Sequence, residues 1–159
     1  MPLRPAAETD LDTIIELIHG LADYEREPDA VLLDRDELRR HLFGARPYAE
    51  VIIAETGAGQ SVGFALFFHN FSTWVGKPGL YLEDLFVRPE FRGHGYGKAL
   101  LVELARLAVE RGCARLEWSV LDWNEPSIQF YKALGAEPMD EWTVYRVSGN
   151  ALTGLATRR

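Results

Sequence analysis

The sequence has a single cysteine, Cys113, among 159 residues, and this scarcity excludes an internal disulfide framework. Long hydrophobic runs are missing as well, because no apolar stretch approaches the ~20 residues of a membrane-spanning helix. The first ten residues also lack the apolar core of a signal peptide. Together these absences predict a cytoplasmic protein that has no membrane partner.

Basic residues are in the minority. Lys and Arg number 17 against 24 Asp and Glu, which gives a formal net charge of −7. A nucleic-acid partner needs a basic face, so this charge argues against one and suits a cationic small molecule. The four histidines are scattered without the spacing of metal ligands, and we expect no metal site. Cys113 has no adjacent histidine to activate it, which favours a buried, inert thiol over a nucleophile.

Regular apolar patterning is what the sequence does have, and it predicts one domain over residues 1–159. Thr9 with Asp12 is expected to cap a first helix, and Asp34 with Glu37 forms a capping box for a second. Early strands are linked by turns and later ones by helices, so we predict an α/β protein with a mixed sheet and helices on both faces. We predict a first helix that begins at Thr9 and further helices at 34–43, 95–111 and 125–135. The predicted strands are 2–7, 49–55, 61–71, 80–87, 114–120 and 142–148.

A glycine-rich loop precedes the long helix at 95–111. Gly93, Gly95 and Gly97 follow Arg92 at alternate positions. Glycines let a phosphate approach the backbone closely, and the start of a helix and an arginine both attract anions, so this loop is predicted to bind a phosphate group. Lys98 is not followed by Ser or Thr, which excludes a nucleotide P-loop. The spacing also departs from the dinucleotide fingerprint, so a nicotinamide enzyme is a weak alternative. The remaining interpretation is a pyrophosphate-bearing ligand held without metal.

Two adjacent acids, Glu83 and Asp84, interrupt the apolar strand predicted at 80–87. Side chains alternate along a strand, so we expect these two to point to opposite faces of the sheet. A carboxylate among apolar neighbours has a raised pKa and becomes a better general base. The alternative is that both acids are edge charges that discourage aggregation.

The segment "LEDLFVRPEFRGHGYGKALL" resembles the acetyl-CoA-binding segment of the GNAT acetyltransferase superfamily, whose motif is Arg/Gln-x-x-Gly-x-Gly/Ala. The segments "LADYE", "WVGK", "DWNEPSIQFYKALGA" and the closing "EW" resemble the spermidine/spermine (diamine) acetyltransferases along nearly the whole chain. The resemblance implies a GNAT fold, with a mostly antiparallel mixed sheet between helices. It also implies acetyl-CoA as co-substrate, a small cationic amine as acceptor, and a homodimer.

The resemblance also implies roles for individual residues. Glu83 would be the general base and Tyr131 the acid that protonates the departing thiolate, while Asp84 would be structural or assist substrate binding. The implied acetyl-CoA-binding residues are Leu85, Phe86, Val87, Arg92, Gly93, His94, Gly95, Tyr96, Gly97, Lys98, Asn124 and Ser127. The implied amine-binding residues are Tyr24, Glu25, Trp74, Glu83, Asp84, Asp140 and Trp142.

One departure from the subfamily bears on the acceptor. Ser72 stands where polyamine-acetylating members carry an acid, and its loss favours a diamine, a thialysine-like amino acid or another small primary amine. Two other classes stay open. An acyl-CoA-binding sensor is disfavoured by the presence of Glu83 and Tyr131, and a protein lysine or N-terminal acetyltransferase would need an open groove.

Overall fold

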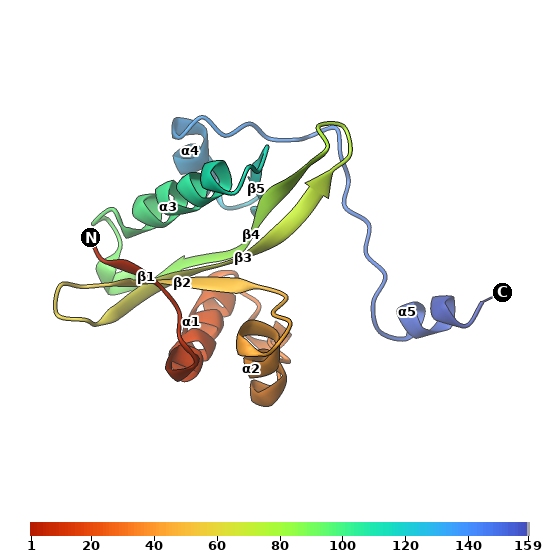
Figure 1. The fold of residues 1–159 in the computed structure, drawn as a ribbon, viewed down its shortest axis with the longest axis horizontal. Helices are drawn as coiled ribbons and strands as arrows, with labels where there is room; N and C mark the ends of the chain where they lie inside the picture. Colours follow the sequence, from red (N-terminus) through yellow and green to blue (C-terminus); the bar gives the residue numbers. More distant parts are fainter. Residues whose placement is uncertain (159) are drawn as a thin grey trace. The chain divides into compact units, whose positions relative to one another are not determined.

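The computed structural model describes residues 1–158, which form two compact units: the first is Met1–Leu121 and the second begins at Asp122. The first unit is built on one five-stranded sheet (Figure 1). The strands lie in chain order, with antiparallel pairing from β1 to β4 and parallel pairing between β4 and β5. Their bounds are β1 (Leu3–Pro5), β2 (Glu50–Glu55), β3 (Ser61–Ser72), β4 (Lys77–Val87) and β5 (Leu116–Trp118). The predicted mixed sheet is confirmed.

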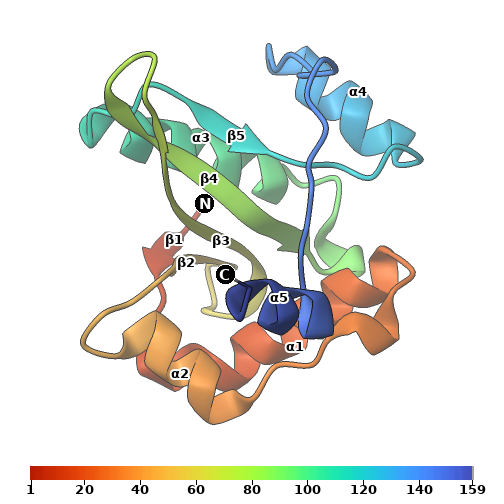
Figure 2. The same cartoon turned by 90° about the vertical axis from the view of Figure 1, so that its right-hand side faces the viewer.

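Helices cover both faces of this sheet, as the sequence predicts. α1 (Leu11–Tyr24) and α2 (Arg35–Phe43) lie on one face, and α3 (Tyr96–Glu110) lies on the other (Figures 1 and 2). Short 3-10 turns precede α1, α2 and α3 at Glu8–Asp10, Pro28–Ala30 and Pro89–Phe91.

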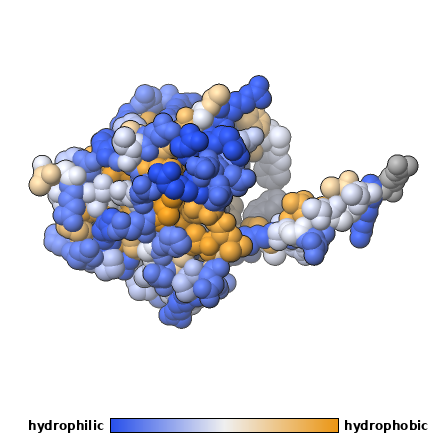
Figure 3. Space-filling model, turned by 90° about the horizontal axis from the view of Figure 1, so that it is seen from below, coloured by the Kyte–Doolittle hydropathy of each residue, from blue (hydrophilic) through white to orange (hydrophobic). Residues whose placement is uncertain are grey.

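The core under α1 and α2 explains why their apolar residues recur at helical spacing. Ile14 and Leu17 of α1 are fully buried against Phe64 of β3 and Phe86 of β4. Each such side chain contributes about 1.5–3 kcal/mol when it leaves water. Seen from below the view of Figure 1, the surface is mostly hydrophilic with a patch of apolar side chains (Figure 3).

The two predicted helix starts have different outcomes. Asp34 caps α2 by accepting a hydrogen bond from the Glu37 backbone N–H, and Gly44 follows the last residue of the helix, as predicted. Thr9 is not the cap of α1. Instead, the Asp10 carboxylate accepts the Ala7 backbone N–H and forms a two-pronged ion pair with Arg4, because this aspartate is buried beside β1.

The second unit contains α4 (Glu125–Ala133) and α5 (Gly149–Ala156). The helix predicted at 125–135 is confirmed, whereas the strand predicted at 142–148 is wrong. Trp142, Val144 and Tyr145 in this segment are 68%, 84% and 92% exposed. A strand needs a hydrogen-bonding neighbour, and no strand among residues 1–158 pairs with this segment.

The described residues include no helix with the length and apolar character needed to cross a bilayer.

Candidate active site

A β-bulge interrupts the pairing of β3 with β4 at Glu83. Leu66 lies opposite Asp84 and Phe67 lies opposite Leu82, so Glu83 is an extra residue on β4. One added residue shifts the alternation of side chains from one face to the other. Asp84 is therefore on the same face as Leu66 and Phe86, which is the face that packs against α1.

Three carboxylates interact beside this bulge. Burial, followed by the negative charges of Glu83 and Glu25, raises the pKa of Asp84 to about 6. Burial and the charge of Glu83 also raise the pKa of Glu25, which follows the last residue of α1. The expectation that the Glu83 and Asp84 side chains point to opposite faces rests on strict alternation, which the bulge interrupts at this point. The half-buried acid of the pair is Asp84, while Glu83 is exposed.

Beyond the bulge, β4 separates from β5. The two strands pair only at Leu80–Leu82, opposite Leu116–Trp118. Among residues 1–158, no strand pairs with the β5-facing edge of residues 83–87. An unpaired strand edge can accept an extended chain through backbone hydrogen bonds. This edge includes Leu85, Phe86 and Val87, the residues that the sequence associates with pantetheine.

The glycine loop ends this part of the sheet and opens α3. Gly93 and Gly95 have φ values of 79° and 87°, and Gly95 is the N-cap of α3. An added Cβ at Gly93 or Gly97 would meet no described atom within 4 Å. The His94 Nδ1 donates to the Arg92 carbonyl oxygen at 3.0 Å and braces the loop. Open glycines at a helix start fit a bound pyrophosphate.

Arg92 is within cation–π distance of two aromatic rings of this unit. Its guanidinium carbon is 4.8 Å from the centre of the Tyr24 ring and 5.4 Å from the centre of the Phe86 ring. Its Nε donates to the Val87 carbonyl oxygen at 3.0 Å. The structure thus brings the end of α1, the end of β4 and the glycine loop to one corner of the first unit, beside the three carboxylates.

Gly20, which the apolar pattern of the first helix does not single out, makes this corner possible. A Cβ at Gly20, one turn before Tyr24 in α1, would stand 2.8 Å from the Phe86 ring. Gly20 therefore admits the Phe86 ring against the helix. A glycine inside a helical pattern costs about 1 kcal/mol relative to alanine, and this cost is the signal that could have drawn attention to it.

Trp74 is not brought to the carboxylates within this chain. It lies at the turn between β3 and β4 and is 84% exposed. Glu83 is six positions after Lys77, the first residue of β4, which is a span of about 20 Å in an extended strand. Ser72 pairs with Lys77 at the same end of the hairpin.

The remaining predicted residues belong to the second unit. Asn124 is the N-cap of α4, where its Oδ1 accepts the Ser127 backbone N–H at 3.4 Å. Tyr131 lies on α4 with its ring centre 5.6 Å from that of Phe130. Asp140 and Trp142 lie in the exposed segment before α5.

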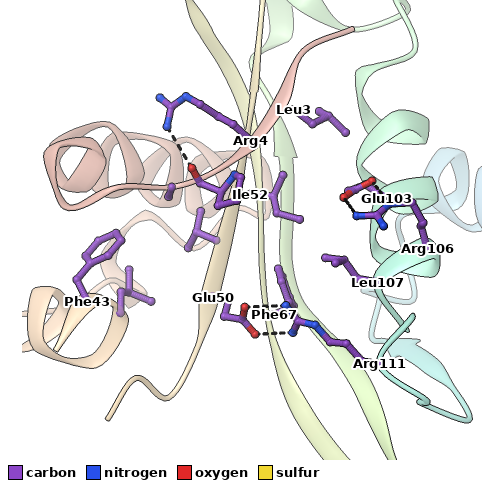
Figure 4. Close-up of a pocket in the computed structure, with 14 residues that line it drawn as sticks. Leu3, Arg4, Phe43, Glu50, Ile52, Phe67, Glu103, Arg106, Leu107 and Arg111 are labelled. Carbon is purple, nitrogen blue, oxygen red and sulfur yellow. Dashed lines mark hydrogen bonds and ion pairs between the residues drawn. The ribbon is translucent and has the colours of Figure 1, made fainter. Parts of the chain in front are cut away.

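One cavity, of about 330 Å³, lies elsewhere in the first unit, between α2, α3 and the strands β1–β3 (Figure 4). None of the predicted site residues lines it. Its charges are paired, since Arg111 binds Glu50 and Arg106 binds Glu103. Within the described part of the chain, no group of His, Cys, Asp or Glu side chains could hold a metal ion.

Comparison with known proteins assigns the chain to a family. Residues 13–136, which span both units, match the model of the acetyltransferase (GNAT) family. The chain therefore belongs to the GNAT acetyltransferases, enzymes that use acetyl-CoA as co-substrate, and the assignment made from the sequence is confirmed.

Individual relatives cover nearly the whole chain. It is 38% identical to the thialysine N-epsilon-acetyltransferase of Bos taurus over 97% of this chain and 96% of that protein. It is 30% identical to the L-ornithine N5-acetyltransferase of Arabidopsis thaliana, over 96% of this chain and 86% of that protein. Among solved structures, an integron cassette protein from V. cholerae superposes with a TM-score of 0.81 at 28% identity, covering 99% of this chain and 98% of that one.

Proposed function

We propose that this enzyme transfers an acetyl group from acetyl-CoA directly to the primary amine of a small cationic acceptor, within a ternary complex. The observation that carries the proposal is the group of three interacting carboxylates, Glu25, Glu83 and Asp84, beside the bulge of β4. Such a group attracts an ammonium ion and lies next to the strand edge and loop suited to the co-substrate.

The co-substrate side consists of a strand edge and an anion site. Acetyl-CoA supplies the activated acetyl thioester. The backbone of Leu85–Val87 holds the pantetheine as an added strand, and an N–H of the same stretch stabilises the oxyanion. Arg92 and the loop that opens α3 bind the pyrophosphate through a cation and unpaired amides. The full set in this loop is Arg92, Gly93, His94, Gly95, Tyr96, Gly97 and Lys98, and Asn124 and Ser127 bind from the start of α4.

The chemical step requires a neutral amine and a protonated leaving group. An alkyl ammonium has a pKa near ~10.4, so a base must take its proton before it attacks. We assign this role to Glu83, acting directly or through one water molecule, with Asp84 and Glu25 holding the cation. Tyr131 donates the proton that the departing thiolate needs.

The acceptor is a diamine, polyamine or thialysine-like amine. The carboxylate group supports a cation, and the names of the two relatives specify thialysine and ornithine, which are small amino acids that carry a side-chain amine. Ser72, in place of an acid, removes one anchor for a long polyamine. We therefore expect short acceptors to be preferred over spermine.

The assembly is proposed to be a homodimer of one-domain chains in the cytoplasm. The family match spans both units, which supports a single domain over 1–159. Two features support a second copy that completes the amine site. One is the exposed segment with Asp140 and Trp142, and the other is the position of Trp74 in the turn before β4, whose first residue is about 20 Å along the strand from Glu83. The single cysteine suits a reducing compartment.

The test is thiol release from acetyl-CoA with putrescine, spermidine, spermine, lysine, thialysine, ornithine and a lysine-containing peptide. We expect a short diamine or amino acid to give the highest kcat/KM. Glu83→Gln should lower kcat by about 10²-fold or more and flatten its pH profile while CoA still binds. Asp36→Asn, an exposed acid on α2, is the matched control.

Two outcomes would overturn the proposal. Activity with the peptide alone would indicate a protein acetyltransferase. Binding of acetyl-CoA without turnover of any amine would indicate a sensor of acyl-CoA.

A further inference from the structure

We infer that Tyr24 acts on the co-substrate side of the site: its ring, together with Phe86, positions the Arg92 guanidinium for the pyrophosphate of acetyl-CoA. This inference rests on the proposed role of Arg92. It differs from the role in amine binding that the sequence indicates for Tyr24, and it makes Tyr24 a positioning residue.

The first support is the geometry of the stack. Arg92 lies 4.8 Å from the centre of the Tyr24 ring and 5.4 Å from that of Phe86, both within the ~6 Å range of a cation–π contact. The Nε bond to the Val87 carbonyl gives the guanidinium a third contact, from the backbone of β4. Two rings and one carbonyl therefore restrict a side chain that otherwise has many rotamers.

The second support is that the two rings come from rigid elements. Phe86 is 6% exposed and belongs to the core under α1. Gly20 admits this ring because an added Cβ would lie 2.8 Å from it. Tyr24 lies four residues after Gly20, so both residues are on one face of α1. The C-terminal part of α1 thus leaves space for the Phe86 ring at Gly20 and supplies the second ring through Tyr24.

The third support is energetic. Binding of a diphosphate loses affinity when a flexible cation must be ordered at the moment of binding. Arginine loses little further freedom if its planar group is already held. Glu25, the next residue, interacts electrostatically with Glu83 and Asp84. Adjacent residues at the end of α1 therefore serve the two substrates separately, with Tyr24 on acetyl-CoA and Glu25 on the amine.

The test is the dissociation constant of CoA, measured by isothermal titration calorimetry without any acceptor. Tyr24→Leu should raise it by about three- to tenfold, the size of a lost cation–π contact. Tyr24→Phe keeps the ring and should stay within about twofold of the unmodified enzyme. Tyr48→Leu, which removes a 75% exposed tyrosine elsewhere in this unit, is the matched control and should leave CoA affinity unchanged.

Steady-state kinetics and a double-mutant cycle separate positioning from other roles. Tyr24→Leu should raise KM for acetyl-CoA by a similar factor while KM for the amine changes less than about twofold. In the Arg92→Gln background, Tyr24→Leu should have no further effect on CoA affinity, because the two residues act through one contact. A rise confined to the amine KM, or effects of the two substitutions that simply add, would overturn the inference.

The outcomes also distinguish this inference from the proposed function. If Arg92→Gln weakens CoA binding and Tyr24→Leu does not, the inference fails and the acetyl-CoA site stands. If Arg92→Gln leaves CoA affinity unchanged, the assignment of the pyrophosphate to Arg92 fails, and the inference fails with it. Thermal unfolding of each variant identifies any loss of affinity that comes from misfolding, and Tyr24→Phe tests the contact in a variant that retains the ring.

Discussion

At the scale of single residues, the site is defined by where charge is buried. Asp84 is the half-buried acid of the adjacent pair, and its pKa is raised to about 6 by burial and by the charges of Glu83 and Glu25. An acid near this value is ionised at neutral pH and can hold a cationic amine. The same burial makes the charged form costly for the folded protein.

Asp84→Asn is expected to stabilise the protein while impairing the enzyme. The pKa of this carboxyl is near its ordinary value of 3.8 in the unfolded chain and about 6 in the folded protein. Between these values the unfolded state has released its proton and the folded state has not, so stability falls as pH rises through this window and remains lower above it. The substitution should therefore add about 1–3 kcal/mol at pH 7.5 and nothing below about pH 3.5. Thermal unfolding across pH measures this.

The activity of the same variant provides the second half of the prediction. The acidic limb of kcat/KM for the amine should lose the step centred near the pKa of Asp84, and kcat/KM at pH 8 should fall by about tenfold or more. A variant that is more stable but has an unchanged pH profile would remove Asp84 from amine binding. Asp36→Asn should change neither the stability window nor the profile.

Tyr131→Phe tests the proposed proton donor on α4. Loss of the phenol should lower kcat by about 10²-fold and leave CoA affinity unchanged, because the ring and the helix remain. The measurement is single-turnover acetyl transfer at saturating acetyl-CoA and amine. Full activity would assign that proton to water, and Tyr145→Phe, an exposed tyrosine in the same unit, serves as the comparison.

At the scale of elements, the site depends on two interruptions of regular structure. The bulge at Glu83 breaks the alternation of β4, and Gly20 breaks the run of side chains on α1. The bulge changes the face on which the following side chains lie, and Gly20 leaves space for the Phe86 ring, so each departure from regular structure shapes the site. Elements with regular periodicity, such as α3, contribute the scaffold between them.

Gly20→Ala separates helix propensity from packing. Alanine favours an isolated helix by about 1 kcal/mol, but here its Cβ would stand 2.8 Å from the buried Phe86 ring. We expect a net loss of about 1–2 kcal/mol in unfolding free energy and weaker CoA binding, because Phe86 also contacts Arg92. Gly154→Ala on α5, where a Cβ meets no described atom within 4 Å, should be neutral or stabilising. Chemical denaturation measures both, and a stabilised Gly20→Ala would contradict the packing argument.

The sequence predicts the regular parts of this fold and not its exceptions. Apolar spacing, together with the Asp34 cap for α2, locates α1, α2, α3, α4 and the strands of the sheet to within a few residues, because local patterns determine them. The bulge is invisible to a pattern of two-residue alternation, since it depends on how β4 pairs with β3. The grouping of Glu25 with Glu83 and Asp84 joins distant segments, so no local pattern reveals it, and only the family resemblance places the three in one set of amine-binding residues.

At the scale of the whole molecule, the segment 142–148 is the part where pattern and structure disagree. Its composition is that of a strand, yet Val144 is 84% exposed and Tyr145 is 92% exposed, and no strand among the described residues pairs with it. Apolar strand-forming residues left in water are a site for association with another chain. The proposed homodimer gives this segment a partner, since a second copy can supply the missing neighbour.

The homodimer predicts a specific effect of charge in this segment. In a two-fold dimer a single substitution changes the interface at two places. Each valine buried in the interface would stabilise the dimer by about 1.5–3 kcal/mol. Val144→Asp should therefore shift the equilibrium from dimer toward monomer at micromolar concentration. Val109→Asp places the same charge on α3 at a residue that is 80% exposed and should leave the dimer intact. Light scattering coupled to size exclusion measures the mass of each, and acetyl transfer measures whether the amine site survives. A monomeric unmodified protein with full activity would show that one chain completes the site; a dimer that resists Val144→Asp would place the interface elsewhere.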